Sequence, residues 1–172
     1  MEKLQTKRAL LRRFQISDLN NMILLESNPD VMKFTPSRIP QGIEKTTARL
    51  KSLIEKETAY APLGVWAVEL KDTGDFVGWF MLVKTEFDLP EIGFMIVKDH
   101  WGKGIASEVA RTLINFAITD LHYPGVAAVT DHDNAASIHI LQKLGFKKVN
   151  SRTKLDTVLG REIEAYVFEL RH

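Results

Sequence analysis

The residues of this sequence that are best suited to bind a ligand or take part in a reaction surround a short glycine turn, WGKGIASE at 101–108. Gly102 and Gly104 precede an amphipathic segment, where the first turn of a helix leaves backbone N–H groups without partners. These donors and the positive end of the helix dipole attract phosphate oxygens, and glycine has no Cβ to keep a ligand away. Lys103 adds a positive charge. A plain strand-to-helix turn can need the same glycines for their dihedral angles, so the motif by itself leaves both interpretations open.

A carboxylate, Glu91, begins the apolar stretch that leads into this turn. In a strand its side chain shares the parity of Gly93, Met95 and Val97. A carboxylate at the mouth of a buried strand can act as a base with a shifted pKa, although it can equally be a solvated strand end or an ion-pair partner. Gly93 predicts a β-bulge or a group that approaches the backbone closely.

A second polar pair, Asn134 and Ser137, stands at the head of an otherwise apolar helical stripe. The stripe continues through Ile140, Leu141 and Leu144 at helical spacing. Asparagine is a good helix N-cap, and a serine one turn later can simply satisfy a backbone group. The alternative is that both side chains face a ligand at the start of the helix.

Other kinds of chemistry find little support. The sequence has no Cys, which excludes disulfides, thiolate metal sites and a cysteine nucleophile. It has no H-x-x-x-H or H-E-x-x-H spacing and no G-x-S-x-G elbow, so we expect neither a metal site nor a serine-hydrolase triad. The cluster of Arg8, Arg12 and Arg13 predicts a solvated strand face rather than a nucleic-acid site.

The elements that must position these residues follow from hydrophobic periodicity and turn signals. Strands are predicted over residues 5–14, 65–70, 76–84, 91–97, 125–130, 146–152 and 161–170. Helices are predicted over 17–27 with Ser17 as the cap, 43–57, 106–117, and from Asn134 to a left-handed Gly145. Asn28-Pro29-Asp30 is expected to end the first helix, and residues 31–42 to be irregular.

The order of these elements predicts the fold class. Strand 91–97, the helix after it and strand 125–130 imply a parallel pair with a right-handed crossover. The remaining connections are compatible with antiparallel neighbours, and no repeat or linker divides the 172 residues. We therefore expect one α/β (α+β) domain over residues 1–172, with a mixed, mostly antiparallel sheet and a single central parallel crossover.

The amino-acid composition limits the binding partners and the cellular location that we expect. Hydrophobic residues make up 45% and charged residues 26%, and 23 Lys and Arg against 22 Asp and Glu give a net charge of +1. That balance argues against broad electrostatic binding to nucleic acid or to an anionic membrane. No apolar run approaches the roughly 20 residues of a membrane span, and MEKLQTKRALLRR has no signal-peptide core. We expect a cytoplasmic protein.

Taken together, these features resemble the GNAT family of acetyl-CoA-dependent N-acetyltransferases, over nearly the whole chain. The resemblance is strongest in WGKGIASE at 101–108, in EIGFMIV before it and in NAASIHILQKLGF at 134–146. TKRALLRRF near the start and NPDVMKF at 28–34 are similar to the branch that acetylates protein N-termini, including those of ribosomal proteins.

The resemblance implies helices on both faces of the sheet and acetyl-CoA as co-substrate, with no metal. The parallel strands would splay apart and admit the pantetheine arm of CoA, and Asn134 would contact that arm. Similar proteins are often dimers, which leaves a homodimer open. By this resemblance, the pyrophosphate of CoA would be held by the backbone amides of Gly102, Lys103, Gly104, Ile105, Ala106 and Ser107. The pantetheine arm would pair with the strand that ends at Met95, Ile96 and Val97, and the amides there would polarise the thioester carbonyl.

Two positions depart from the wider family pattern. Trp101 stands where many members have Arg or Gln, although the N-terminal branch often tolerates Trp. Leu141 stands where many members have the tyrosine that protonates the departing thiolate. Ser137, one turn away on the same face, is our candidate for that acid, as in the resembling branch.

The implied reaction is direct attack of a neutral amine on the acetyl carbonyl. A lysine-like amine with a pKa near 10.4 needs about 4.6 kcal/mol to be neutral at pH 7, whereas an α-amine near 8 needs about 1.4 kcal/mol. A weak base acting through water suffices for the second, and we assign that role to Glu91 as a hypothesis. Segments 28–42 and 85–90 are the expected substrate rim.

The acceptor is open to several classes of amine: peptide N-termini, aminoglycosides, polyamines and free amino acids. Two other functions also remain. A dinucleotide oxidoreductase could use GKGIAS as its glycine loop, although Ser107 replaces the third glycine. An acyl-CoA-binding sensor could keep the fold and lack catalysis, an alternative that Leu141 favours.

Overall fold

The computed structural model describes residues 4–172, with the side chain of Lys154 left out; residues 1–3 of the expected domain lie outside this range. The strands are β1 (Ala9–Arg12), β2 (Gly64–Leu70), β3 (Phe76–Val83), β4 (Glu91–Ile96), β5 (Gly125–Asp131), β6 (Lys147–Asp156) and β7 (Arg161–Arg171). The α-helices are α1 (Leu19–Glu26), α2 (Pro29–Met32), α3 (Ile43–Glu55), α4 (Glu57–Tyr60), α5 (Ile105–Asn115) and α6 (Ala135–Lys143).

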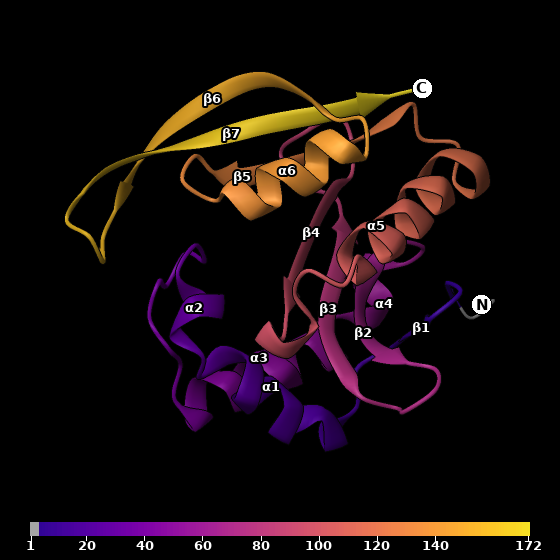
Figure 1. Ribbon diagram of the computed structural model, residues 1–172, viewed down its shortest axis with the longest axis vertical. Coiled ribbons are helices and arrows are strands. Elements are labelled where there is room, and N and C mark those ends of the chain that lie inside the picture. Colours follow the sequence, from indigo (N-terminus) through magenta and orange to yellow (C-terminus); the bar gives the residue numbers. More distant parts are fainter. Residues whose placement is uncertain (1–3) are drawn as a thin grey trace.

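The strands form one mixed sheet in the order β1-β2-β3-β4-β5-β7-β6 (Figure 1). Its neighbours are antiparallel except β4 and β5, which are parallel because α5 carries the chain back between them. This confirms the predicted fold class. One parallel pair is too few for the doubly wound sheet of a dinucleotide oxidoreductase, and that alternative is therefore wrong.

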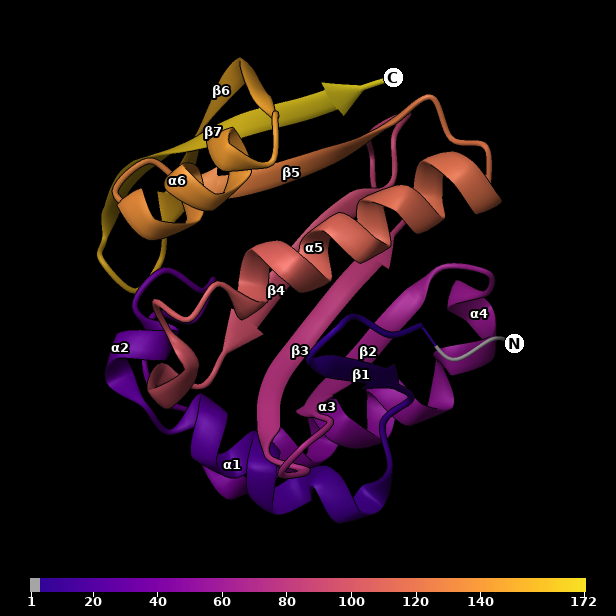
Figure 2. The ribbon, with the colours of Figure 1, turned by 45° about the vertical axis from the view of Figure 1, so that its right-hand side comes forward.

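The β4–β5 pair opens almost as soon as it forms. Glu91 and Ala127 are paired in register, and the Ala127 N–H donates to the Pro90 carbonyl at 2.9 Å. Beyond this point the strands diverge, and the ribbon shows β4 and β5 running apart (Figure 2). The sheet is thus divided into a β1–β4 half and a β5–β7 half, joined at one end.

Side chains of the central strands alternate between two cores, as the pleat requires. Phe80 and Ile92 join Val109 and Leu113 of α5 on one face. Trp79 and Met95 on the other face pack with α1 and α3, in a cluster completed by Phe14, Met22, Leu25, Val31, Met32, Leu50 and Ala67. Helices therefore cover both faces, and α5 lies in front of β4 in Figure 2.

The N-terminal third contains the local errors of the sequence prediction. Ser17 does not cap a helix; it lies in a 3₁₀ turn over Ile16–Asp18, because the Asp18 carboxylate accepts the N–H of Gln15 at 2.9 Å and starts the turn earlier. The first helix ends at Glu26, just before Asn28 as expected, but Asn28 also begins a second helix, since its side chain accepts the N–H of Asp30 at 2.9 Å and caps α2. Residues 31 and 32, expected to be irregular, are therefore helical.

Within the arginine cluster Arg8 is exposed, but Arg12 and Arg13 are half-buried and ion-paired rather than solvated. Arg12 bridges the carboxylates of Asp18 and Glu69, each at 2.8 Å, and Arg13 lies 3.2 Å from Glu57.

In the described part of the chain, none of the helices has the length and apolar character needed to cross a bilayer.

Candidate functional site

A pocket of about 1170 Å³ occupies the opening between β4 and β5. Its walls come from β3, β4, β5 and β7, from α2 and the segment after it, from α3 and α6, and from the start of α5. The residues that line it include Lys33, Phe34, Arg38, Arg49, Trp79, Met81, Glu91, Phe94, Met95, Ile96, Trp101, Gly102, Gly104, Asn134, Ser137 and Leu141. Residues far apart in the sequence meet here because the sheet splits at this point.

The open edge of β4 presents peptide groups to the pocket. The Val97 N–H donates to the Val77 carbonyl at 2.9 Å, and backbone groups alternate along an antiparallel strand, so the peptide groups of Phe94 and Ile96 face the β5 side. The carbonyl of Ile96 accepts the indole N–H of Trp101 at 2.8 Å. The N–H groups of Phe94 and Ile96 thus face the gap, where an extended ligand can pair with them as an added strand.

The glycine turn is shaped to leave helix N–H groups open. Gly102 and Gly104 have φ angles of 71° and 75°, values that residues with a Cβ rarely adopt. A Cβ at Gly102 would meet no atom within 4 Å, so space is open on that side. Arg8 holds the turn in place by donating to the Lys103 carbonyl at 2.9 Å and to Glu108 at 2.7 Å. The sequence analysis did not assign Arg8 to this site.

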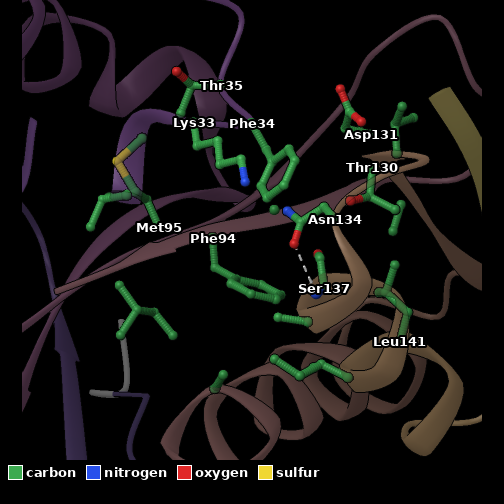
Figure 3. A pocket seen from close by; sticks show the side chains of 18 of the residues that line it. Lys33, Phe34, Thr35, Phe94, Met95, Thr130, Asp131, Asn134, Ser137 and Leu141 are labelled. Carbon is green, nitrogen blue, oxygen red and sulfur yellow. Dashed lines mark hydrogen bonds between the residues drawn. The ribbon is translucent and has the colours of Figure 1, made fainter. Parts of the chain in front are cut away.

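Asn134 and Ser137 are joined at the head of α6. The Asn134 side-chain oxygen accepts the Ser137 N–H at 3.1 Å, and Figure 3 shows the Asn134 amide nitrogen on the side of Lys33 and Phe34. Both residues line the pocket. The capping role and a ligand-contacting role are therefore compatible, because different atoms of Asn134 serve them.

Leu141 lines the same pocket one turn beyond Ser137, and it is only 2% exposed. It packs in the core beneath α6 and offers no proton. Among the three labelled residues of α6 and its cap in Figure 3, Ser137 and Asn134 carry the polar groups.

Glu91 is half-buried and lines the pocket at the end where β4 and β5 still pair. Burial raises the pKa of its carboxyl above the ordinary 4.5, partly offset by a hydrogen bond with Thr85. The pairing of β3 with β4 is regular through Gly93, so the bulge expected there is absent. The close approach is real: a Cβ on Gly93 would lie 2.8 Å from the terminal methyl of Met81.

The predicted cofactor residues divide into two sets. Seven of them line the pocket: Met95, Ile96, Gly102, Gly104, Ala106, Ser107 and Asn134. Val97, Lys103 and Ile105 do not line it. The Val97 N–H is bonded to β3, the Lys103 carbonyl to Arg8, and the Ile105 side chain is buried in the core. Backbone contacts at Lys103 and Ile105 stay predictions.

The wall of the pocket formed by α3, β3 and the segment after α2 contains residues that the sequence motifs did not single out. Lys33 and Phe34 follow α2, and in Figure 3 both reach toward Asn134. Arg49 of α3 stacks over the Trp79 ring at 5.2 Å. These residues are far apart in the sequence, so no motif groups them. Lys33 and Phe34 fall within the predicted substrate rim at 28–42, but neither was predicted individually.

Three potential metal ligands lie together at the end of β5. Asp131, His132 and Asp133 each place one ligand atom within 4.8 Å of the others. Asp131 uses one oxygen for the Asp133 N–H and the other for Arg38. Its carboxylate is thus engaged by protein groups, and the expectation of no metal stays a prediction.

Comparison with known proteins gives a consistent result. Residues 8–147 match a family model described as an acetyltransferase (GNAT) domain. The chain is 29% identical over 173 residues to an "uncharacterized N-acetyltransferase p20" of Bacillus licheniformis, which covers 99% of this chain and 96% of that protein.

Two solved structures share the fold. One is RimL, a ribosomal L7/L12 alpha-N-protein acetyltransferase in complex with coenzyme A, with TM-score 0.83, 14% identity and coverage of 99% and 98% of the two chains. The other is spermidine N-acetyltransferase from Vibrio cholerae in complex with CoA and spermine, with TM-score 0.77, 18% identity and coverage of 95% of each chain. The names of these two proteins specify different acceptors, so the shared fold does not select one.

Proposed function

The chain belongs to the GNAT family and is an N-acetyltransferase, and from this premise we propose that it transfers an acetyl group from acetyl-CoA directly to the α-amine of a protein or peptide N-terminus. The observation that carries the proposal is one continuous pocket. It reaches from the glycine turn, past the open edge of β4 and the Asn134–Ser137 pair, to the half-buried Glu91.

The glycine turn would hold the pyrophosphate of CoA through backbone N–H groups at the start of α5. The pantetheine arm would lie along β4, where the N–H groups of Phe94 and Ile96 face the gap. The Asn134 amide would donate to the arm. These contacts use groups that the fold leaves available, and they place the thioester between β4 and the head of α6.

Transfer then needs three proton movements. The ammonium form of the acceptor loses its first proton through one or two waters to Glu91, the neutral nitrogen bonds to the acetyl carbon, and the carbon–sulfur bond breaks as the nitrogen releases its second proton to solvent. The departing thiolate takes a proton from the Ser137 hydroxyl, which solvent restores. Glu91 suits the base role because burial raises its pKa toward neutrality.

The charges of the pocket favour an α-amine over a polyamine. Three described carboxylates line the pocket, and two are ion-paired: Asp30 lies 2.6 Å from Lys98, and Asp131 is bound by Arg38. Lys33 adds positive charge to the same wall, whereas the charge of Arg49 is balanced by Glu26 at 3.1 Å. A polyamine carries several positive charges and would find only Glu91 unpaired among these three carboxylates. A single α-amine needs only one base.

The test is a screen for free-thiol release from acetyl-CoA with peptides, polyamines, aminoglycosides and free amino acids as acceptors. We expect peptides with a free α-amine to give the highest kcat/KM, and the same peptides blocked at the N-terminus to give none. Faster turnover of spermidine would contradict the acceptor assignment. Tight acetyl-CoA binding by calorimetry without thiol release for any amine would instead favour the sensor alternative.

A further inference from the structure

Arg38 joins three segments at the edge of the pocket. Its guanidinium donates to Asp131 at the end of β5, to Asp156 at the end of β6, and to the carbonyl of Lys33 at 2.9 Å. The arginine side chain is 10% exposed, and the two carboxylates are 5% and 4% exposed. This is a buried, charge-assisted network rather than a surface ion pair.

The backbone around Arg38 is adapted to this contact. Arg38 has a φ angle of 55°, which is uncommon for a residue with a side chain. Its N–H donates to the Thr35 carbonyl at 3.1 Å, closing a tight turn after the pocket-lining residues. An unfavourable conformation persists where the surroundings impose it, and here two carboxylates do so.

The network spans the division in the sheet. Segment 33–38 follows α2 and belongs with the β1–β4 half, whereas Asp131 and Asp156 belong to the β5–β7 half. The strands of the two halves pair only at the Glu91 end of β4. Arg38 therefore connects the halves on the side where the strands have separated.

The same network continues to the Asn134–Ser137 pair. Asp131 accepts the Asp133 N–H at 2.9 Å through its side chain, and its carbonyl accepts the Asn134 N–H at 3.0 Å. Asn134 in turn accepts the Ser137 N–H. The position of α6 relative to Lys33 and Phe34 thus depends on one chain of hydrogen bonds that begins at Arg38.

We propose that Arg38 is a positioning residue that sets the spacing between the acceptor segment 33–38 and the head of α6. The expected kinetic effect rests on the proposed acetyl transfer. In that reaction Arg38 would keep the acceptor amine in line with the thioester. Removal of the guanidinium leaves two buried carboxylates facing each other, so the segment moves away and the pocket widens. Lysine cannot reproduce the planar fork, because its ammonium is a single point of contact.

The test compares Arg38→Gln and Arg38→Lys with Arg12→Gln. Arg12 is the matched control, because it also bridges two carboxylates, Asp18 and Glu69, and it does not line the pocket. For the acceptor, Arg38→Gln should raise KM on the order of tenfold and lower kcat by a similar factor, since small displacements at a reacting centre are costly. Arg38→Lys should recover part of this loss, and Arg12→Gln should keep both constants within twofold.

A second measurement separates this proposal from the proposed function. Amide hydrogen exchange, followed in each variant without acceptor, should rise together in residues 33–38 and 131–137 of Arg38→Gln and in neither segment of Arg12→Gln. This readout applies even if no amine is acetylated. Unchanged exchange at 131–137, or equal kinetic losses in the two glutamine variants, would overturn the positioning role.

Discussion

The backbone N–H of Ser137 lies 3.1 Å from the side-chain oxygen of Asn134 and donates to it. This bond caps α6 and at the same time orients the amide nitrogen of Asn134 away from the helix (Figure 3). One asparagine can therefore stabilise the helix with its oxygen and bind the pantetheine arm with its nitrogen. The two functions can be separated by mutation.

Asn134→Asp keeps a capping oxygen and loses the amide donor, whereas Asn134→Ala loses both. We expect the aspartate variant to unfold at the parent's urea midpoint and the alanine variant to lose about 1 kcal/mol of stability. Both should bind acetyl-CoA roughly fivefold more weakly, as one hydrogen bond predicts. Calorimetric titration measures the affinity, and parent-like affinity in both variants would remove Asn134 from the cofactor site.

Ser137→Ala removes the proposed proton donor. We expect kcat to fall on the order of 100-fold while the KM for acetyl-CoA stays unchanged, because the hydroxyl acts after binding. Ser137→Thr keeps a hydroxyl and should recover most of the rate. Steady-state thiol release measures both constants. If the alanine and threonine variants lose the same factor, steric change rather than proton donation explains the effect.

Glu91→Gln tests the base through its pH dependence. Because burial raises the pKa of Glu91 above 4.5, the ionised base of the parent forms only as pH rises through that higher value. The kcat of the parent should therefore rise with pH on the acidic side. The glutamine variant should be slower and should lack that rise. A pH profile of kcat with the parent's shape in Glu91→Gln would exclude Glu91 as the base.

The glycine turn can be tested against a glycine of the same conformation elsewhere. Gly102 and Gly74 have φ angles of 71° and 74°, and a Cβ at either would meet no atom within 4 Å. Alanine at each should thus cost a similar roughly 1–2 kcal/mol of backbone strain. Only Gly102→Ala should also weaken CoA binding, because its Cβ occupies space beside the proposed pyrophosphate site. Equal affinities in the two variants would argue against that site.

Asp18 should control part of the acid stability. Burial disfavours its ionised form, but bonds from Arg12 and from the Gln15 N–H outweigh burial and lower the pKa below the ordinary 3.8. Between the folded pKa and 3.8 the unfolded chain binds more protons, so stability falls as pH drops through this window. Asp18→Asn should be less stable at neutral pH and should lose less on acidification. Urea unfolding at several pH values provides the comparison.

Local patterns predicted much of the site. The left-handed glycine at 145, the cap at Asn134 and the strand that begins at Glu91 depend on neighbouring residues, and the structure has them as expected. The errors at Ser17 and Asn28 have a different origin. At Ser17, the neighbouring Asp18 carboxylate accepted the Gln15 N–H and started a 3₁₀ turn earlier. At Asn28, Asn-Pro-Asp is typical of a turn but also of a helix start with Asn as N-cap, and the structure uses the second of these local signals.

What the sequence determined by itself is the succession of the seven strands, the parallel crossover and the glycine turn that follows strand 91–97, because period and turn chemistry are properties of short segments. Only the tertiary structure decided that the sheet divides after Glu91 and that Arg38 meets Asp131 and Asp156 across the division. Those contacts join residues about a hundred positions apart, and no local signal encodes which distant carboxylate a buried arginine will find. The wall of the pocket around Lys33 and Arg38 therefore depends on the tertiary fold rather than on any motif.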